Sequence, residues 1–199
     1  MKEYEKIETI FKRDLDTKKI IEGQYRNKTI EYLKDCIWEF SEKVDGTNIR
    51  VVWDGHKVMF YGRTDKAQIP SFLLTKLQEL FGGNTNEEIF EQLFGASQVV
   101  LYGEGYGAKI QNGGGYRDDV SFILFDIEID GIYLERESVA DIAEKLKIEC
   151  VPILFSGTLQ EGIDYVKQHP SSYIAMKDAD MEGLVARPQH ELKDRLGNR

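Results

Sequence analysis

A lysine-containing hexapeptide followed by two strand-like segments is the feature that most restricts the fold of this chain. Residues 43–48 read Lys-Val-Asp-Gly-Thr-Asn, and residues 49–53 and 57–61 are rich in β-branched and aromatic side chains. Asp54-Gly55-His56 between them is a turn signal, so we expect a β-hairpin directly after the hexapeptide. A strand over 36–42 would then place Lys43 and Asp45 on the same side of the chain, facing one pocket.

The residue types of the hexapeptide suit covalent nucleotide chemistry. Lysine has a reference pKa near ~10.4 and attacks phosphorus as a neutral amine, which requires burial or cationic neighbours. Gly46 would allow a close approach to a phosphate, and Asn48 offers an amide for a phosphate oxygen or a metal-bound water. Lys-x-Asp-Gly also occurs in surface turns where the lysine is merely solvated, so the hexapeptide alone is not decisive.

The hairpin brings Arg63 beside the hexapeptide in either of two registers. A two-residue turn sets Arg63 opposite Gly46, and a one-residue slip sets it opposite Asn48. A guanidinium there could neutralise phosphate oxygens, contact a ribose and help to keep Lys43 deprotonated. The alternative is a surface ion pair between Arg63 and Asp65.

Three further strand-like segments carry candidate site residues. Glu104 ends the segment 99–104, and Glu182 lies in the segment 181–186. Carboxylates at strand ends are typical site positions. Phe125, within 121–127, could stack on a purine or belong to the ordinary core.

In this order the motifs resemble the covalent nucleotidyltransferase superfamily, which contains ATP-dependent ligases and capping guanylyltransferases. Asparagine at position 48 is similar to the RNA ligases that seal nicks in duplexes, whereas DNA ligases and capping enzymes usually have arginine there. The resemblance covers about residues 36 to 199. The matching residues are Lys43 to Asn48, Arg63, Gly103-Glu104-Gly105, Phe125-Asp126-Ile127 and Glu182-Gly183-Leu184-Val185.

The resemblance implies how a nucleotide would be bound. Lys43 would be the nucleophile that carries AMP covalently after reaction with ATP. Glu42 would contact the adenine edge, Phe125 would stack on the adenine ring, and Glu104 would hold a ribose hydroxyl.

The remaining matched positions would act on the phosphates. Arg63 would contact ribose or phosphate, Asn48 would help to orient the phosphates, and Asp45 would support the lysine loop. Glu182 would lie near a divalent cation, with Mg²⁺ as the expected metal.

The implied reaction is ATP-dependent RNA ligation. Lys43 attacks the α-phosphorus of ATP and expels pyrophosphate, AMP passes to a 5′-phosphate, and a 3′-hydroxyl displaces AMP. Such in-line transfers depend mainly on positioning and electrostatic stabilisation. The expected partner is nicked RNA or an RNA-containing duplex. The alternatives are a DNA ligase, a capping guanylyltransferase, or a non-catalytic nucleotide- or RNA-binding module.

We expect residues 1–199 to form a single adenylyltransferase domain, because the chain has no linker, repeat or low-complexity tract. The superfamily continues past Leu-Gly-Asn-Arg at 196–199 into a strand whose lysines contact the α-phosphate, and Lys193 does not match these lysines. The resemblance thus implies that the terminal lysine motif and the C-terminal module are missing. A second chain or a missing segment would complete the site, and self-adenylylation of the isolated chain would be weak or absent.

Charge and composition restrict the partners. A net charge of −9 opposes nonspecific binding to nucleic acid, so a nucleic-acid substrate needs a local basic rim. Short basic runs could contribute, although such runs usually lie on solvated surfaces: Lys12-Arg13, Lys18-Lys19 and Arg26-Asn27-Lys28.

The chain shows no signature of a zinc site, a disulfide framework or a membrane span. Cys36 and Cys150 form no CxxC pair, and the three histidines have no ligand spacing. The first residues lack the apolar core of a signal peptide, and no apolar run approaches the ~20 residues of a membrane span. The expected location is therefore cytoplasmic.

Apolar periodicity predicts an α+β fold of mainly antiparallel sheets flanked by helices, as in the nucleotidyltransferase (ATP-grasp-like) domain of ligases. The glycine-rich residues 111–116 could approach phosphates or form a flexible connection. We expect helices over 71–81, 86–94, 137–146 and 158–168, and strands near 5–12, 36–42, 49–62, 98–104, 121–129 and 181–187.

Overall fold

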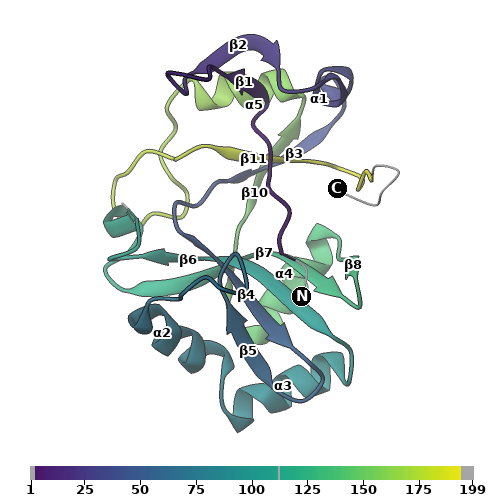
Figure 1. Ribbon diagram of the computed structural model, residues 1–199, viewed down its shortest axis with the longest axis vertical. Helices are drawn as coiled ribbons and strands as arrows, with labels where there is room; N and C mark the ends of the chain where they lie inside the picture. The colour runs from purple at the N-terminus through teal and green to yellow at the C-terminus, as the bar shows by residue number, and fades with distance from the viewer. Residues whose placement is uncertain (1–2, 112, 194–199) are drawn as a thin grey trace. The chain divides into compact units, whose positions relative to one another are not determined.

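Strands with buried apolar side chains build the largest sheet of the protein (Figure 1). The computed structural model describes residues 3–111 and 113–193. The sheet has the order β5-β4-β6-β7-β8, all antiparallel, and β9 pairs with β7 in parallel. Its strands are β4 (Thr47–Trp53), β5 (Val58–Tyr61), β6 (Val99–Gly107), β7 (Val120–Ile129), β8 (Ile132–Tyr133) and β9 (Glu149–Cys150).

Three helices pack their apolar stripes against this sheet: α2 (Ser71–Phe81), α3 (Asn84–Phe94) and α4 (Arg136–Leu146). Leu73 and Leu77, one helical turn apart on α2, are fully buried in the same cluster as Val51 and Leu124 of the sheet. Removing these side chains from water is the main force that holds the layers together. The sheet and helices form one compact unit, made of Glu42–Pro152 and Ser171–Gly183 with residues 3 and 4.

A second unit comprises Glu5–Ser41, Ile153–Pro170 and the described residues from 184 onward. Its three-stranded sheet has the order β10-β3-β11, and the Phe40 ring of β3 stacks on Phe155 of β10 with centroids 4.7 Å apart. Gly162 lies against Phe40, since a Cβ there would be 2.3 Å from the ring. The elements are β1 (Phe11–Arg13), β2 (Ile20–Tyr25), α1 (Lys28–Leu33), β3 (Trp38–Glu42), β10 (Ile153–Gly157), α5 (Leu159–Val166) and β11 (Leu184–Pro188).

The predicted fold class is confirmed, with mainly antiparallel sheets flanked by helices. The helix predicted over 71–81 has those bounds, and the other three predicted helices differ by one or two residues at their ends. The strand predicted near 5–12 is wrong, because β1 begins only at Phe11. The helix α1 and four strands, β2, β8, β9 and β10, were not predicted.

The hairpin has a longer turn than the two-residue turn that the sequence favoured. Trp53 pairs with Val58, and the Asp54 carboxylate accepts hydrogen bonds of 2.9 Å from the backbone amides of His56 and Lys57. This local capping stabilises a four-residue turn. Extending the observed register by two residues brings Arg63 level with Asn48, so the register with Arg63 opposite Gly46 is wrong.

Two sequence predictions fall partly outside the described residues. Asn112 of the glycine-rich loop lies outside them, while Gly113–Gly115 form a 3₁₀ turn. The tetrapeptide at 196–199 lies outside them as well. Within residues 3–111 and 113–193, no helix is long and apolar enough to cross a membrane.

Candidate active site

Lys43 follows the last residue of β3 and is bound through both its backbone and its side chain. Its backbone amide donates a hydrogen bond of 2.9 Å to the carbonyl of Gly183, and its ammonium group forms an ion pair with Glu182. These contacts join segments 139 positions apart in the sequence. Glu182 lies just before β11 rather than within a strand, so it belongs to the loop that contacts the lysine.

Gly46 lets the lysine loop lie directly on β6. A Cβ at this position would be 2.4 Å from the carbonyl oxygen of Gly105 and 2.6 Å from Cγ of Glu104. Such distances are far below a van der Waals contact, so only glycine fits. The contact with β6 therefore explains why position 46 has no side chain, and a close approach of a phosphate to Gly46 stays a prediction.

Glu104 lies opposite Asn48 in the pairing of β4 with β6. The sequence suggested that Glu104 ends its strand. In the structure β6 continues to Gly107, so Glu104 lies inside the strand. Burial raises the pKa of Glu104 to about 8. This carboxyl group is therefore mostly protonated at neutral pH.

Four charged side chains act on Glu104 besides its burial. Lys43 and Arg63 lower its pKa, while Glu182 and Asp45 raise it. Interactions of this kind fall off with distance, so these four predicted site residues lie around the same carboxyl group. The structure thus gathers five of the eight candidates into one charged cluster.

Asn48 has a buried side-chain oxygen, Oδ1, with no hydrogen-bond partner among the described residues. A buried acceptor without a donor is costly, so such an atom points to a missing partner. A metal-bound water or a ribose hydroxyl could donate to it. A phosphate oxygen could not, unless the amide turned its nitrogen toward the site.

Arg63 lies in a short loop that is bound by the side chain of Arg50. The guanidinium of Arg50 is fully buried, donates 3.0 Å to the carbonyl of Gly62, and pairs with Asp65 at 2.7 Å. These two contacts lie on either side of Arg63 in the sequence. The hydrogen bond from Arg50 holds the pKa of Asp65 below its usual range.

Glu42 is buried, and both oxygens of its carboxylate accept hydrogen bonds from the segment 171–183. Ser172 donates through its hydroxyl and Tyr173 through its backbone amide, at 2.8 Å. A contact from Glu42 to an adenine edge stays a prediction. It would require the carboxylate to share these donors or to exchange one of them.

Phe125 lies at a β-bulge. Tyr102 pairs with Asp126 and Gly103 with Leu124, which leaves Phe125 as the extra residue of β7. A bulge re-aims a side chain, and the partly buried ring of Phe125 contacts Tyr4 with centroids 5.0 Å apart. Stacking on a base and packing in the core both remain open for this residue.

Tyr116 is a site neighbour that the sequence did not single out. Its buried hydroxyl accepts a hydrogen bond of 3.2 Å from the backbone amide of Asp45. No periodicity connects the two positions, and the only signal was an aromatic residue at the end of a glycine-rich run. Among the described residues, no group of three histidine, cysteine, aspartate or glutamate side chains is arranged to hold a metal ion.

Comparison with known proteins identifies one family and one fold. A family model described as RNA ligase matches residues 37–199. No curated protein sequence is significantly similar to the chain.

Two solved structures illustrate the shared fold. A lysine-to-alanine mutant of Naegleria gruberi RNA ligase with ATP and Mn is 22% identical, with a TM-score of 0.64, over 81% of this chain and 48% of that chain. Naegleria gruberi RNA ligase with PPi is 21% identical, with a TM-score of 0.63, over 81% of this chain and 49% of that chain. The chain therefore spans about half the length of these ligases.

Proposed function

Because the chain belongs to the RNA ligase family, we propose that it catalyses the adenylylation of Lys43 by ATP as the first step of RNA ligation. The observation that carries this proposal is the cluster of Lys43, Asp45, Arg63 and Glu182, whose charges act on Glu104 within a single compact unit. A lysine nucleophile, the carboxylates of Asp45 and Glu182, and the guanidinium of Arg63 together suit the transfer of a nucleotidyl group.

The proposed step forms one bond and breaks one bond. The amine nitrogen of Lys43 attacks the α-phosphorus of ATP, and the bond from that phosphorus to the pyrophosphate leaving group breaks. The ammonium group must first lose a proton. Both side chains of the Lys43–Glu182 pair are partly exposed, so this proton can pass to water.

A divalent cation fits the acceptor atoms near Lys43. The Glu182 carboxylate, together with phosphate oxygens of ATP, would hold Mg²⁺, and Asn48 Oδ1 would accept from one of its waters. The cation would supply positive charge to the phosphates. Naegleria gruberi RNA ligase mutants with ATP and Mn support this part of the proposal.

The nucleoside would lie between β6 and the β7 bulge. Glu104, mostly protonated at neutral pH, can both donate to and accept from a ribose hydroxyl. Phe125 would offer its ring to the adenine, and Glu42 would read the adenine edge. Arg63 would contact the ribose or the phosphates.

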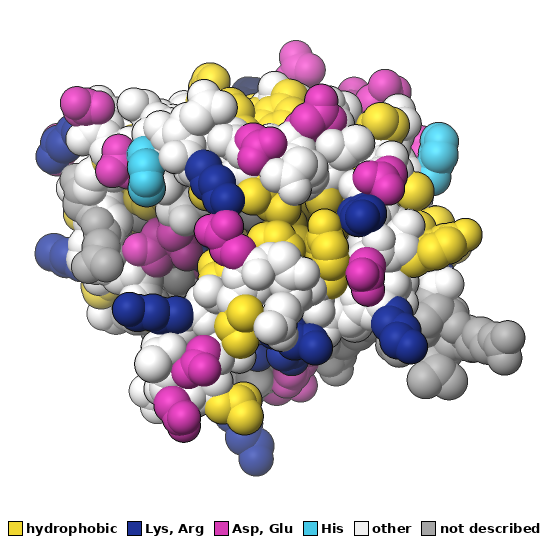
Figure 2. Space-filling view, turned by 90° about the horizontal axis from the view of Figure 1, so that it is seen from above, with side chains coloured by type: hydrophobic (Ala, Val, Ile, Leu, Met, Phe, Trp, Pro, Cys, Tyr) yellow, Lys and Arg dark blue, Asp and Glu magenta, His cyan; other side chains and the backbone are white. Residues whose placement is uncertain are grey.

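In the following steps, AMP passes to a 5′-phosphate and a 3′-hydroxyl seals the strand, with nicked RNA or an RNA-containing duplex as the substrate. Figure 2 shows acidic and basic side chains interspersed on one face rather than a single basic patch. Arg26, in one of the predicted basic runs, pairs with Glu8 at 3.3 Å, and Asn27 caps α1. On this face, a few local cations and not a broad positive field would therefore contact the phosphates.

Labelling with nucleotide tests the first step. The chain is incubated with Mg²⁺ and α-labelled ATP or GTP, beside the variants Lys43→Ala and Lys43→Arg, and is then denatured. We expect the unmodified chain to be labelled by ATP and not by GTP. Neither variant should be labelled. Label from GTP would make the chain a guanylyltransferase. Unlabelled protein that still binds ATP would contradict the proposed step for this chain.

A pre-adenylylated nick tests the nucleic-acid partner. Duplexes with a 5′-adenylylated strand and either RNA or DNA at the 3′-hydroxyl end are offered to the chain without ATP. We expect sealing only when the 3′-hydroxyl end is RNA. Equal sealing of DNA would favour a DNA ligase.

A further inference from the structure

We propose that Tyr116 is a positioning residue for Lys43, which it holds by accepting the hydrogen bond of the Asp45 backbone amide. This inference rests on the proposed function and adds a residue that the superfamily motifs do not include. Tyr116 would contact neither ATP nor the metal. It would act by fixing the backbone on which the nucleophile stands.

The lysine loop is held from two directions. The Lys43 amide donates to Gly183, and the Asp45 amide donates to the phenolic oxygen of Tyr116, at 2.9 and 3.2 Å. Val44, between the two donors, packs in the same apolar cluster as Tyr116. The backbone amides of Lys43 and Asp45 thus each have a fixed hydrogen-bond acceptor.

Tyr116 is itself attached to the segment that carries Glu182. Its carbonyl accepts a hydrogen bond of 2.8 Å from the amide of Met176, and the carbonyl of Gly115 accepts one of 3.3 Å from Lys177. The loop around Tyr116 therefore connects the nucleophile to the segment that supplies its carboxylate partner. A shift of this loop would move both.

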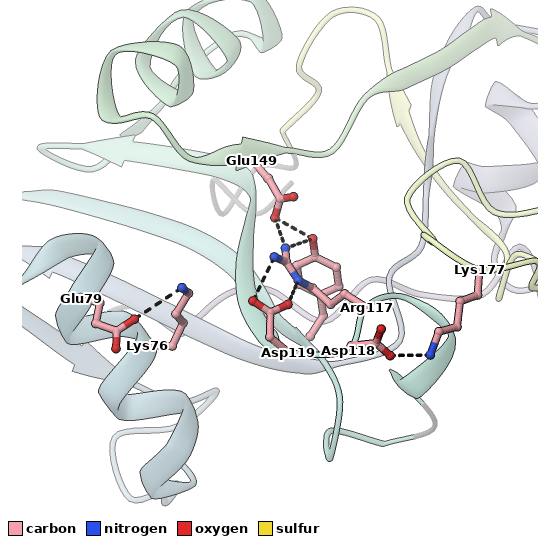
Figure 3. Close-up of polar contacts among 8 residues, drawn as sticks. Lys76, Glu79, Arg117, Asp118, Asp119, Glu149 and Lys177 are labelled. Atoms are coloured by element: carbon pink, nitrogen blue, oxygen red, sulfur yellow. Dashed lines mark hydrogen bonds and ion pairs between the residues drawn. The ribbon is translucent and has the colours of Figure 1, made fainter.

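Ion pairs anchor the residues that directly follow Tyr116 in the sequence (Figure 3). Arg117 lies next to Tyr116 and donates 2.9 Å to Glu149 and 3.1 Å to the hydroxyl of Tyr106. It also pairs with Asp119, while Lys177 pairs with Asp118. Such a supporting layer is what keeps a reacting group in one place.

The hydroxyl of Tyr116 is the group that matters here. Phenylalanine would fill almost the same volume and keep the edge contact with Tyr106, where the ring centroids are 5.8 Å apart. It would leave the Asp45 amide without its acceptor. Burial raises the pKa of Tyr116, so the group stays a neutral phenol at neutral pH.

The test compares Tyr116→Phe with Tyr133→Phe, because Tyr133 is a similarly buried tyrosine, 7% exposed against 8%, outside the cluster that contains Tyr116. Single-turnover rates of Lys43 adenylylation are measured over a range of ATP concentrations. Small misplacements of a reacting group lower rates strongly, so we expect Tyr116→Phe to lower the maximal rate about tenfold. The ATP concentration at half-maximal rate should change less than about twofold, and Tyr133→Phe should leave the rate within about twofold. An unchanged rate in Tyr116→Phe would overturn the inference.

Hydrogen exchange separates this inference from the proposed function. The amide of Asp45 should exchange about tenfold faster in Tyr116→Phe than in the unmodified chain and be unaffected in Tyr133→Phe. Exchange elsewhere in the unit reports whether the variant is folded. Failure of the unmodified chain to form an adenylate would contradict the proposed function alone, whereas unchanged exchange at Asp45 would contradict the role of Tyr116 alone.

Discussion

The ammonium group of Lys43 pairs with the carboxylate of Glu182, although both side chains are partly open to solvent, at 51% and 36% exposure. Ion pairs at such exposure stabilise a fold by at most about 1 kcal/mol. This pair therefore contributes little to folding, and we propose that it serves the chemistry of Lys43. The backbone hydrogen bond from Lys43 to Gly183 keeps the segments together when the side chains part.

Replacing Glu182 by glutamine should separate activity from stability. We expect Glu182→Gln to lower the rate of lysine adenylylation more than about tenfold, because Lys43 loses its carboxylate partner and the cation a ligand. The free energy of unfolding should change by less than about 1 kcal/mol. Asp178→Asn, an exposed carboxylate in the same segment, is the matched control and should change neither. A large loss of stability in Glu182→Gln would mean that the ion pair is structural.

The raised pKa of Glu104 predicts a pH-dependent stability. Its pKa is about 8 in the folded protein and near the reference value of 4.5 in the unfolded chain, so the folded state binds the proton more tightly between these values. The contribution of Glu104 to stability is thus full below pH 4.5 and is lost as the pH rises to about 8, by at most about 1.4 kcal/mol per pH unit. Urea unfolding of the unmodified chain and of Glu104→Gln should give curves that diverge over this range and run parallel above it. Parallel curves throughout would show that the carboxyl group titrates normally.

The contact of Gly46 with β6 predicts that Gly46→Ala displaces the lysine loop. The new methyl group would overlap the carbonyl of Gly105, so we expect a loss of about 2 kcal/mol in unfolding free energy and a strongly reduced adenylylation rate. If Gly46→Ala were as stable and as active as the unmodified chain, the close packing of the loop on β6 would be disproved.

The buried Arg50 should matter more for stability than the more exposed Arg63. Arg50→Met removes the donor to the buried carbonyl of Gly62, so we expect a loss of about 2 kcal/mol. Arg63→Met should cost less than about 1 kcal/mol but weaken ATP binding. Denaturant unfolding and equilibrium binding of ATP distinguish the two outcomes. Loss of ATP binding in Arg50→Met without loss of stability would place Arg50 in the site itself.

Sequence reasoning predicted the elements with strong periodicity and missed those without it. Leu73 and Leu77, four residues apart, belong to the periodic apolar pattern that predicted α2. The helix α1 buries none of its residues, and β2 is largely exposed, so neither carries a readable apolar pattern. The hairpin strands were predicted correctly, but the register was set by the Asp54 side chain, which caps a longer turn.

The site was predictable as a set of motifs but not as a set of contacts. The order of the motifs predicted that Lys43 and Glu182 belong to the same site, and in the structure the two side chains form an ion pair. The contact of Gly46 with β6 was not predicted, because Glu104 and Gly105, which it touches, are 58 and 59 positions away in the sequence and share no pattern with it. The contact of Tyr116 with Asp45 was missed for the same reason.

Peptide mapping of the chain after incubation with ATP and Mg²⁺ tests most directly that Lys43 carries the nucleotide. The chain is digested under conditions that preserve a phosphoramidate, and the fragment with residues 43–48 is analysed by mass spectrometry. We predict a mass increase of one AMP on Lys43, which disappears when pyrophosphate is added back before digestion. AMP on another residue, or an unmodified Lys43 in protein that has bound ATP, would contradict the assignment of Lys43 as the nucleophile.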